Sequence, residues 1–253
     1  MTPSKPLILV TNDDGIRAPG IKFLAEALAE VGQVEVYAPE GQQSAVGHGV
    51  SLHRPLRVST IAPGWHMVDG TPTDCVMLAV RSLLGRKPDL VVSGVNAGAN
   101  LGDDVTYSGT VAGAFEGMLL GVPSIAVSDV SYKPQRQDTA AQVAARVARY
   151  VLANGLPDDT TLNVNVPDVD YGDLKGLAIT RMGRRSYQDD IVRREDPRGG
   201  VYYWIGGDEP THIMESGTDF EAIEAGKVSI TPLHRDVTYH AALHHFYEPA
   251  IEL

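Results

Sequence analysis

Two adjacent aspartates, Asp13 and Asp14, follow the apolar run LILV near the start of the sequence. The run is short and continuous, which predicts a buried parallel strand, and no basic residue lies within the stretch LILVTNDDGI. Neighbouring carboxylates repel each other, and a chain that needs only a turn uses a single Asp or Asn. A divalent cation would stabilise both charges. The pair therefore predicts a metal site at the end of the first strand.

The stretch NDDG also allows a simpler interpretation as a turn. Gly15 would adopt a positive φ, and the aspartate side chains would accept hydrogen bonds from local amides. Taken alone, the four residues favour this turn. Their place after the first strand of a parallel sheet favours the metal site, because ligands of such sheets bind beyond the carboxyl ends of the strands.

Two further oxygen donors follow other predicted strands. Ser44 lies in the polar loop after the strand at 34–39, and Asn96 follows the strand at 89–94. These side chains should meet Asp13 and Asp14 at one edge of the sheet. Carboxylate, hydroxyl and amide oxygens suit Mg²⁺ or Mn²⁺, which also bind substrate phosphate oxygens. The sequence contains neither a cysteine pair nor HExxH, which argues against a zinc hydrolase.

The stretch YSGTVAGAFEG predicts an anion site at the start of a helix. Ser108, Gly109 and Thr110 come just before an apolar helical pattern, so their amides and hydroxyls can bind a phosphate. Asn12, beside the aspartates, is assigned to the same phosphate. The alternative is that Ser108 or Thr110 only caps the helix, and both functions are compatible at one position.

The elements that must position these residues alternate between strands and helices over the first 156 residues. Further strands are predicted at 7–10 and 124–128, and helices at 20–31, after the Thr71 cap, from about Thr110 and at 137–153. This order predicts an α/β fold with a doubly wound, mostly parallel sheet. We expect one domain over 1–253, with this core at 1–156.

The remaining part, about 157–253, has a different pattern. Two more strands are predicted in LNVNVP and LAITR, and 183–217 is rich in charge, tyrosine and glycine. We interpret 183–217 as a β-hairpin or arm that projects from the sheet. Its aromatic residues suggest contact with another subunit, although a hairpin folded back on its own domain is an equal alternative; they are Tyr187, Tyr202, Tyr203 and Trp204.

Composition limits the partners. The formal net charge of -11 gives a nucleic acid polymer no general attraction, whereas a small anion can still bind if a metal supplies positive charge. Cys75 is the single cysteine and lies in an apolar helical pattern, so we expect a buried core residue. No stretch suggests a membrane span or a leader, and we expect a cytoplasmic protein.

Taken together, these motifs resemble the SurE family, the stationary-phase survival proteins. The stretches that carry the resemblance are VTNDDG, QSAVGHG, GTPTDCV, DLVVSGVNAGAN, YSGTVAGAFEG, VPSIAVS, LNVNVP, DPRGGVYYWIGG and VSITPL. The resemblance implies a Rossmann-like core, and dimers or tetramers built partly by exchanged C-terminal elements. It also implies a metal-dependent 5'/3'-nucleotidase, with exopolyphosphatase as a further activity.

Carried over to this sequence, the ligands of one Mg²⁺ or Mn²⁺ per subunit fall on Asp13, Asp14, Ser44 and Asn96. The serine and threonine of YSGT, Ser108 and Thr110, lie beside the phosphate. Gln42 and Gln43 stand where relatives often carry a basic residue before the serine.

The expected reaction is the hydrolysis of nucleoside monophosphates by in-line attack of water. The expected catalytic residues are Asp13, Asp14, Asn96 and Ser108. His48 is a candidate acid or a neighbour of the metal ligands, but a solvated loop histidine is the more common case. Two alternatives are a nucleotide-binding regulatory oligomer without turnover, and a purely structural oligomer organised by the arm.

Overall fold

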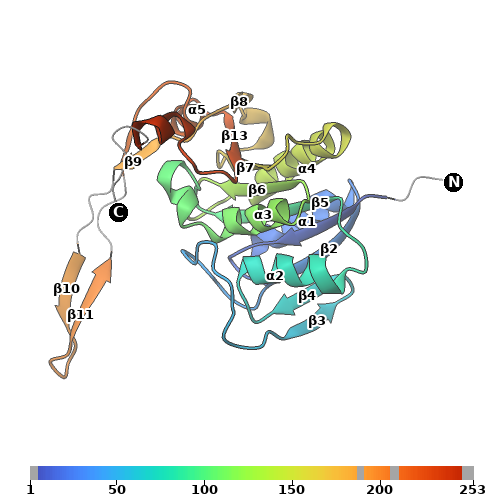
Figure 1. Ribbon diagram of the computed structural model, residues 1–253, viewed down its shortest axis with the longest axis horizontal. Coiled ribbons are helices and arrows are strands. Elements are labelled where there is room, and N and C mark those ends of the chain that lie inside the picture. Colours follow the sequence, from blue (N-terminus) through green and yellow to red (C-terminus); the bar gives the residue numbers. More distant parts are fainter. Residues whose placement is uncertain (1–4, 187–190, 206–210, 247–253) are drawn as a thin grey trace.

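The computed structural model describes residues 5–186, 191–205 and 211–246. Its centre is a nine-stranded, mostly parallel sheet (Figure 1). Six neighbouring strands run parallel, whereas β3 at one edge and the pair β13 and β8 at the other run in the opposite direction. In spatial order the strands are β3 (Val58–Ala62), β4 (Trp65–Val68), β2 (Gln33–Pro39), β1 (Leu7–Thr11), β5 (Leu90–Ala97), β6 (Ser124–Asp129), β7 (Thr160–Val166), β13 (Val228–His234) and β8 (Leu177–Ile179).

Helices cover both faces of this sheet, as the alternating pattern predicted. On one face α1 (Pro19–Ala29) packs beside α4 (Gln137–Asn154), and on the other α2 (Pro72–Leu78) packs beside α3 (Gly109–Leu119). The side chains of β1 alternate between the two resulting cores, with Ile8 in the first core and Leu9 in the second. Burial on both faces explains why this strand reads as a continuous apolar run.

The predicted start of the helix after Thr71 is confirmed. Thr71 and Asp74 form a reciprocal capping box at the start of α2, with Pro72 in the first turn. Cys75 is fully buried in the core beneath α2, as expected. After α2 the chain continues into a π-helical turn, Ala79–Leu83.

The C-terminal part adds an element that the sequence pattern did not predict as a separate strand. The strand β13 inserts antiparallel to β7, so that it separates the two predicted strands β7 and β8. The short helices in the rest of the chain are η2 (Gly102–Thr106), η3 (Tyr171–Asp173), α5 (Asp219–Glu224) and η4 (His240–Phe246). No helix in the described ranges is long and apolar enough to cross a membrane.

The predicted arm is present as an antiparallel hairpin of β10 (Ile191–Glu195) and β11 (Val201–Ile205). It projects away from the sheet and its helices (Figure 1), which argues against the alternative of a hairpin folded back on the domain. Tyr202, Tyr203 and Trp204 are exposed. Tyr187 lies outside the described residues.

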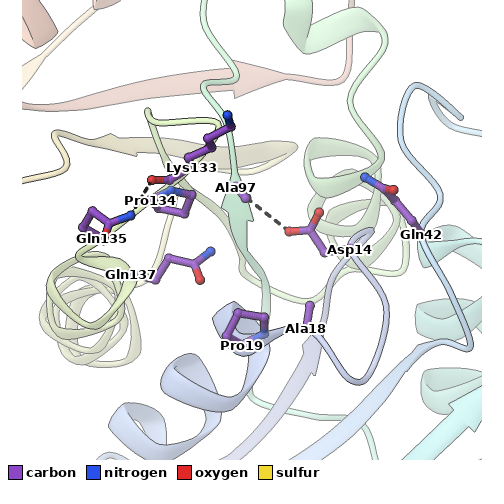
Figure 2. Close-up of a pocket in the computed structure, with 9 residues that line it drawn as sticks. All are labelled: Asp14, Ala18, Pro19, Gln42, Ala97, Lys133, Pro134, Gln135 and Gln137. Atoms are coloured by element: carbon purple, nitrogen blue, oxygen red, sulfur yellow. Dashed lines mark hydrogen bonds between the residues drawn. The ribbon is translucent and has the colours of Figure 1, made fainter.

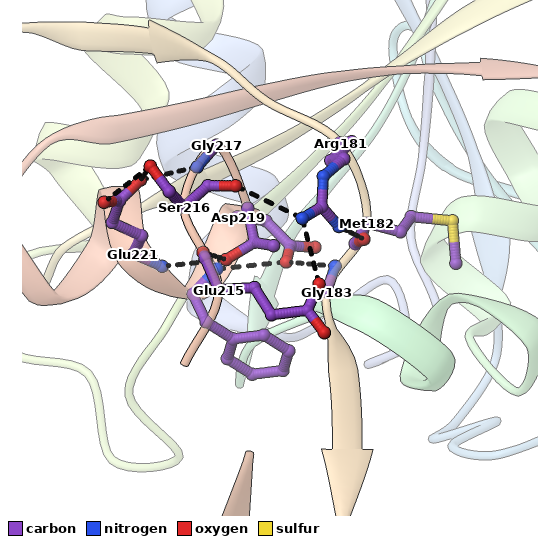
Figure 3. A network of polar contacts seen from close by, with 10 residues as sticks. Arg181, Met182, Gly183, Glu215, Ser216, Gly217, Asp219 and Glu221 are labelled. Carbon is purple, nitrogen blue, oxygen red and sulfur yellow. Dashed lines mark hydrogen bonds and ion pairs between the residues drawn. The ribbon is translucent and has the colours of Figure 1, made fainter. Parts of the chain in front are cut away.

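A polar network holds the root of this arm (Figure 3). There β9 (Arg184–Ser186) pairs with β12 (Thr211–Ile213). The buried carboxylate of Asp219 accepts hydrogen bonds from the backbone N–H of Gly183 at 2.8 Å and of Gly102 at 2.8 Å. Asp219 therefore fixes the start of the arm to the loop that precedes α3.

Candidate metal and phosphate site

The turn after β1 is built by Asn12 and Gly15 and not by the aspartates. The Asn12 amide donates to the carbonyl oxygen of Gly15 at 3.0 Å, and Gly15 adopts a φ of +96°. The carboxylates of Asp13 and Asp14 instead bond to residues 97 and 83 positions away. The simple turn interpretation therefore does not account for the two acidic side chains.

Asp13 packs directly against the start of α3. Its carboxylate accepts a hydrogen bond from the Thr110 hydroxyl, and a Cβ added to Gly109 would lie 2.8 Å from the Asp13 Cβ. Glycine is needed here because the helix backbone approaches the aspartate so closely. Asp13 is buried, and burial raises its pKa to about 6, with a further increase from Asp14 that the Thr110 bond partly offsets.

Asp14 is turned toward the neighbouring strand and an open cavity (Figure 2). Its carboxylate accepts a hydrogen bond of 3.1 Å from the backbone N–H of Ala97 in β5. Partial burial raises its pKa, and the Ala97 bond acts in the opposite direction. The two carboxylates thus lie side by side in sequence but face different neighbours.

Ser44 and Asn96 are brought to the same edge by the loops after β2 and along β5. The backbone N–H of Gln43 donates to the carbonyl oxygen of Asp13 at 2.7 Å, which places Ser44 next to the aspartate turn. The Gln42 amide donates to the Ser44 hydroxyl oxygen at 3.0 Å. Asn96, beside Ala97, donates its amide to the carbonyl oxygen of Gly98 at 2.8 Å, so its own carbonyl oxygen remains for a ligand.

The start of α3 has a side-chain cap and a first turn whose amides lack helical partners. Ser108 is the N-cap, and its hydroxyl oxygen accepts a bond from the Val111 N–H at 3.0 Å. The Thr110 hydroxyl donates to Asp13, so its hydrogen is not available to a phosphate. The first-turn amide of Gly109 has no partner within the helix and is the donor that an anion could use, whereas the Thr110 N–H faces the Asp13 carboxylate and lowers its pKa.

His48 and Glu116 form a second pair of residues, which links the loop after β2 to the middle of α3. The sequence analysis considered His48 but not Glu116. His48 is not simply solvated, because its Nε2 lies 3.0 Å from Oε2 of the buried Glu116. The Gly47 N–H also donates to the carbonyl oxygen of Tyr107 at 3.0 Å. The loop that carries Ser44 is therefore attached to α3. A single acidic residue inside the apolar stretch TVAGAFEGML was the signal that could have identified Glu116.

These residues fit a hard divalent cation by the chemistry of their donors. Across the described ranges, no three His, Cys, Asp or Glu side chains gather in a metal cluster. The candidate set has two carboxylates, a hydroxyl and an amide, which suits Mg²⁺ or Mn²⁺ because these ions retain waters and bind substrate phosphates. The raised pKa values of Asp13 and Asp14 reflect the cost of burying two adjacent negative charges, which a cation would offset.

Comparisons with known proteins agree with the resemblance seen in the sequence. The family described as "Survival protein SurE" matches residues 8–189. A protein named 5'-nucleotidase SurE from Geobacter sulfurreducens is 56% identical over 237 residues, covering 93% of this chain and 90% of that protein. Another of the same name, from Pelobacter propionicus, is 54% identical, with 93% and 96% covered.

The fold agrees as well. The crystal structure of the SurE protein from Aquifex aeolicus superimposes with a TM-score of 0.86 at 43% sequence identity, and the match covers 96% of this chain and 99% of that one. Sequence and structure thus match along nearly the whole chain, and the chain belongs to the SurE family of survival proteins.

Proposed function

We propose that this protein is a 5'-nucleotidase, which hydrolyses nucleoside 5'-monophosphates to nucleoside and phosphate with one Mg²⁺ or Mn²⁺ per subunit. The observation that carries the proposal is the contact of Asp13 with the start of α3. The Asp13 carboxylate, which we assign to the cation, lies against the positive end of a helix dipole, so a metal and a phosphate could occupy adjacent positions. The names of the relatives from Geobacter and Pelobacter support the same activity.

Each residue of the site has a separate role in this proposal. Asp13, Asp14, Ser44 and Asn96 would hold the cation, and the Gly109 amide at the start of α3 would bind a phosphate oxygen. When bound, the cation withdraws negative charge from the phosphoryl group as the P–O bond breaks. Asn12 and Ser108 fix the two turns that carry these groups.

Water attacks in line with the bond that breaks, and the loose transition state of phosphoryl transfer needs positioning and charge stabilisation more than a strong base. Hydrolysis of 3'-monophosphates and short polyphosphates is included in the proposal, because the donors named above contact the phosphoryl group alone.

A phosphate-release panel after chelation tests the proposal. The protein is treated with EDTA, and AMP, 3'-AMP and tripolyphosphate are then supplied with Mg²⁺, Mn²⁺ or no metal. We expect phosphate from AMP only with added metal. Undiminished release from the chelated protein would refute the metal-dependent reaction. Metal and AMP binding without any release would favour the alternative, a regulatory nucleotide-binding protein.

A further inference from the structure

A cavity of about 440 Å³ opens beside Asp14 at the carboxyl edge of the sheet (Figure 2). Asp14 and Gln42 lie on one side of it, and the segment 133–135 lies across from them. Small-molecule sites in proteins typically have volumes of roughly 300–1,000 Å³. The cavity therefore has room for a group far larger than the water that attacks the phosphate.

The cavity borders Asp14 and is lined by no residue of α3, whereas the start of α3 packs against Asp13. Ala18 and Pro19 at the start of α1 and Gln137 at the start of α4 form its floor, and these helices cover the face of the sheet that α3 does not. A phosphate held at Gly109 lies beside Asp13. Because Asp13 and Asp14 are adjacent, a substituent on a phosphate held at Gly109 can extend past Asp14 into the cavity.

The lining is uncharged apart from Asp14 and one cation. Gln42, Gln135 and Gln137 contribute amides, which can donate to and accept from hydroxyl groups and ring nitrogens. The Lys133 side chain is exposed, and its ammonium group makes no ion pair within the described part of the chain. Gln135 donates to the Lys133 carbonyl oxygen at 3.0 Å, which holds the segment in its turn.

We propose that this cavity receives the nucleoside part of the substrate, with Lys133 as the residue that contacts it and sets the preference for nucleotides over other phosphomonoesters. This inference rests on the proposed nucleotidase activity. An ammonium group donates strong hydrogen bonds to sugar hydroxyls and base acceptors. The amides of Gln42, Gln135 and Gln137 complete a lining that suits a polar, uncharged leaving group.

The first test compares two substrates. AMP carries a nucleoside, whereas p-nitrophenyl phosphate carries neither sugar nor base and has a leaving group that departs without help. We expect Lys133→Ala to raise KM for AMP by about five- to tenfold, the size of one ordinary net hydrogen bond at an exposed side chain. KM for p-nitrophenyl phosphate and kcat for both should change less than about twofold. Lys133→Arg should retain most of the AMP preference.

A second variant fills the cavity without removing a charge. Ala18 has an extended backbone and no capping hydrogen bond, so Ala18→Trp leaves α1 intact and places a large ring in the cavity. Ala18→Trp should raise KM for AMP more than KM for p-nitrophenyl phosphate, the same direction that we expect for Lys133→Ala. Lys175 is an exposed lysine outside the cavity lining. Lys175→Ala is therefore the matched control and should leave KM for both substrates unchanged.

Direct binding separates this inference from the proposed function. Adenosine should bind the wild-type protein in a calorimetric titration and bind Lys133→Ala at least about fivefold more weakly. If wild-type protein releases no phosphate from AMP, the nucleotidase proposal fails, while adenosine binding still decides the role of the cavity. Equal losses for both substrates, or adenosine binding unaffected by Lys133→Ala and Ala18→Trp, would overturn the inference.

Discussion

At the residue scale, the two aspartates differ in their surroundings although they are adjacent in sequence. Asp13 is enclosed by Gly109 and Thr110, and Asp14 faces the cavity. The Thr110 hydroxyl is thus committed to a metal-ligand candidate, which the pattern YSGT alone did not predict. This hydrogen bond acts to lower the pKa of Asp13 and so favours its ionised form.

Replacing Thr110 by alanine should therefore weaken metal binding as well as phosphate binding. Loss of the hydroxyl removes a hydrogen bond that lowers the pKa of Asp13, so the ionised ligand becomes less favourable. We expect about a fivefold loss of Mn²⁺ affinity, the size of one ordinary hydrogen bond. Thr110→Ser should restore it. Calorimetric titration of both variants with Mn²⁺ measures this, and an affinity unchanged in Thr110→Ala would contradict the role given to the hydroxyl.

Asp129, at the end of β6, is a second buried carboxylate with a raised pKa. Burial raises its pKa to about 7, and the neighbouring Asp168 raises it further, whereas a bond from the Ser131 N–H acts to lower it. In the unfolded chain an aspartate titrates near a pKa of about 3.9. Between about pH 4 and 7 the folded state therefore binds the extra proton, and the free energy of unfolding falls as pH rises.

Replacing Asp129 by asparagine should remove this dependence, because the amide keeps an acceptor for Ser131 and carries no charge. We expect Asp129→Asn to be more stable than wild type by roughly 1–2 kcal/mol at pH 8 and nearly equal at pH 4. Urea unfolding of both proteins at the two pH values gives the difference. A variant that loses as much stability as wild type between these values would show that Asp129 does not cause the effect.

At the element scale, the sequence predicted most of the sheet and the helices that cover it. The continuous run of β1 and the Thr71 cap of α2 have local causes, namely burial on both faces and a capping box. The place of β13 between β7 and β8 depends on pairing between distant segments, which no local pattern records. The site shows the same difference between local and distant causes. The adjacent Asp13 and Asp14 form a local motif that the sequence alone identifies, whereas the hydrogen bond between His48 and Glu116 joins residues 68 positions apart.

The hydrogen-bonded pair of His48 and Glu116 holds the loop after β2 against α3. His48→Ala would leave the buried Glu116 carboxylate without its hydrogen-bonded imidazole, at a cost of roughly 1–3 kcal/mol in unfolding free energy. The loop would loosen from α3, so the Mn²⁺ affinity of the proposed cation site, to which we assign Ser44, should also fall by several-fold. Thermal unfolding and Mn²⁺ titration measure the two effects.

Two control variants make this prediction specific. His48→Gln keeps a donor near the Glu116 carboxylate and should recover part of both losses. His53→Ala removes an exposed histidine from the same stretch of chain and should change neither. Loss of stability with full metal affinity in His48→Ala would mean that the pair stabilises the fold without positioning Ser44.

At the scale of the whole molecule, the arm exposes apolar side chains that the rest of the described chain does not cover. Within the described residues, β11 is exposed along its whole length, with Tyr203 at 61%, Trp204 at 65% and Ile205 at 86% exposure. An isolated two-stranded hairpin is only marginally stable in water. Aromatic side chains are enriched at interfaces between proteins. We therefore expect the arm to be covered by another copy of the chain, in a homodimer or homotetramer.

Replacing Trp204 and Ile205 by serine should shift this oligomer toward monomer. Each substitution removes apolar surface that would be buried at the interface, at about 25 cal/mol per Å². The pairing of β10 with β11 relies on backbone hydrogen bonds and should persist. Sedimentation velocity across a range of concentrations measures the shift. Leu52→Ser, which removes an equally exposed apolar side chain from a loop, is the control. A wild-type protein that sediments as a monomer, or a double variant with unchanged assembly, would mean that the arm serves another partner.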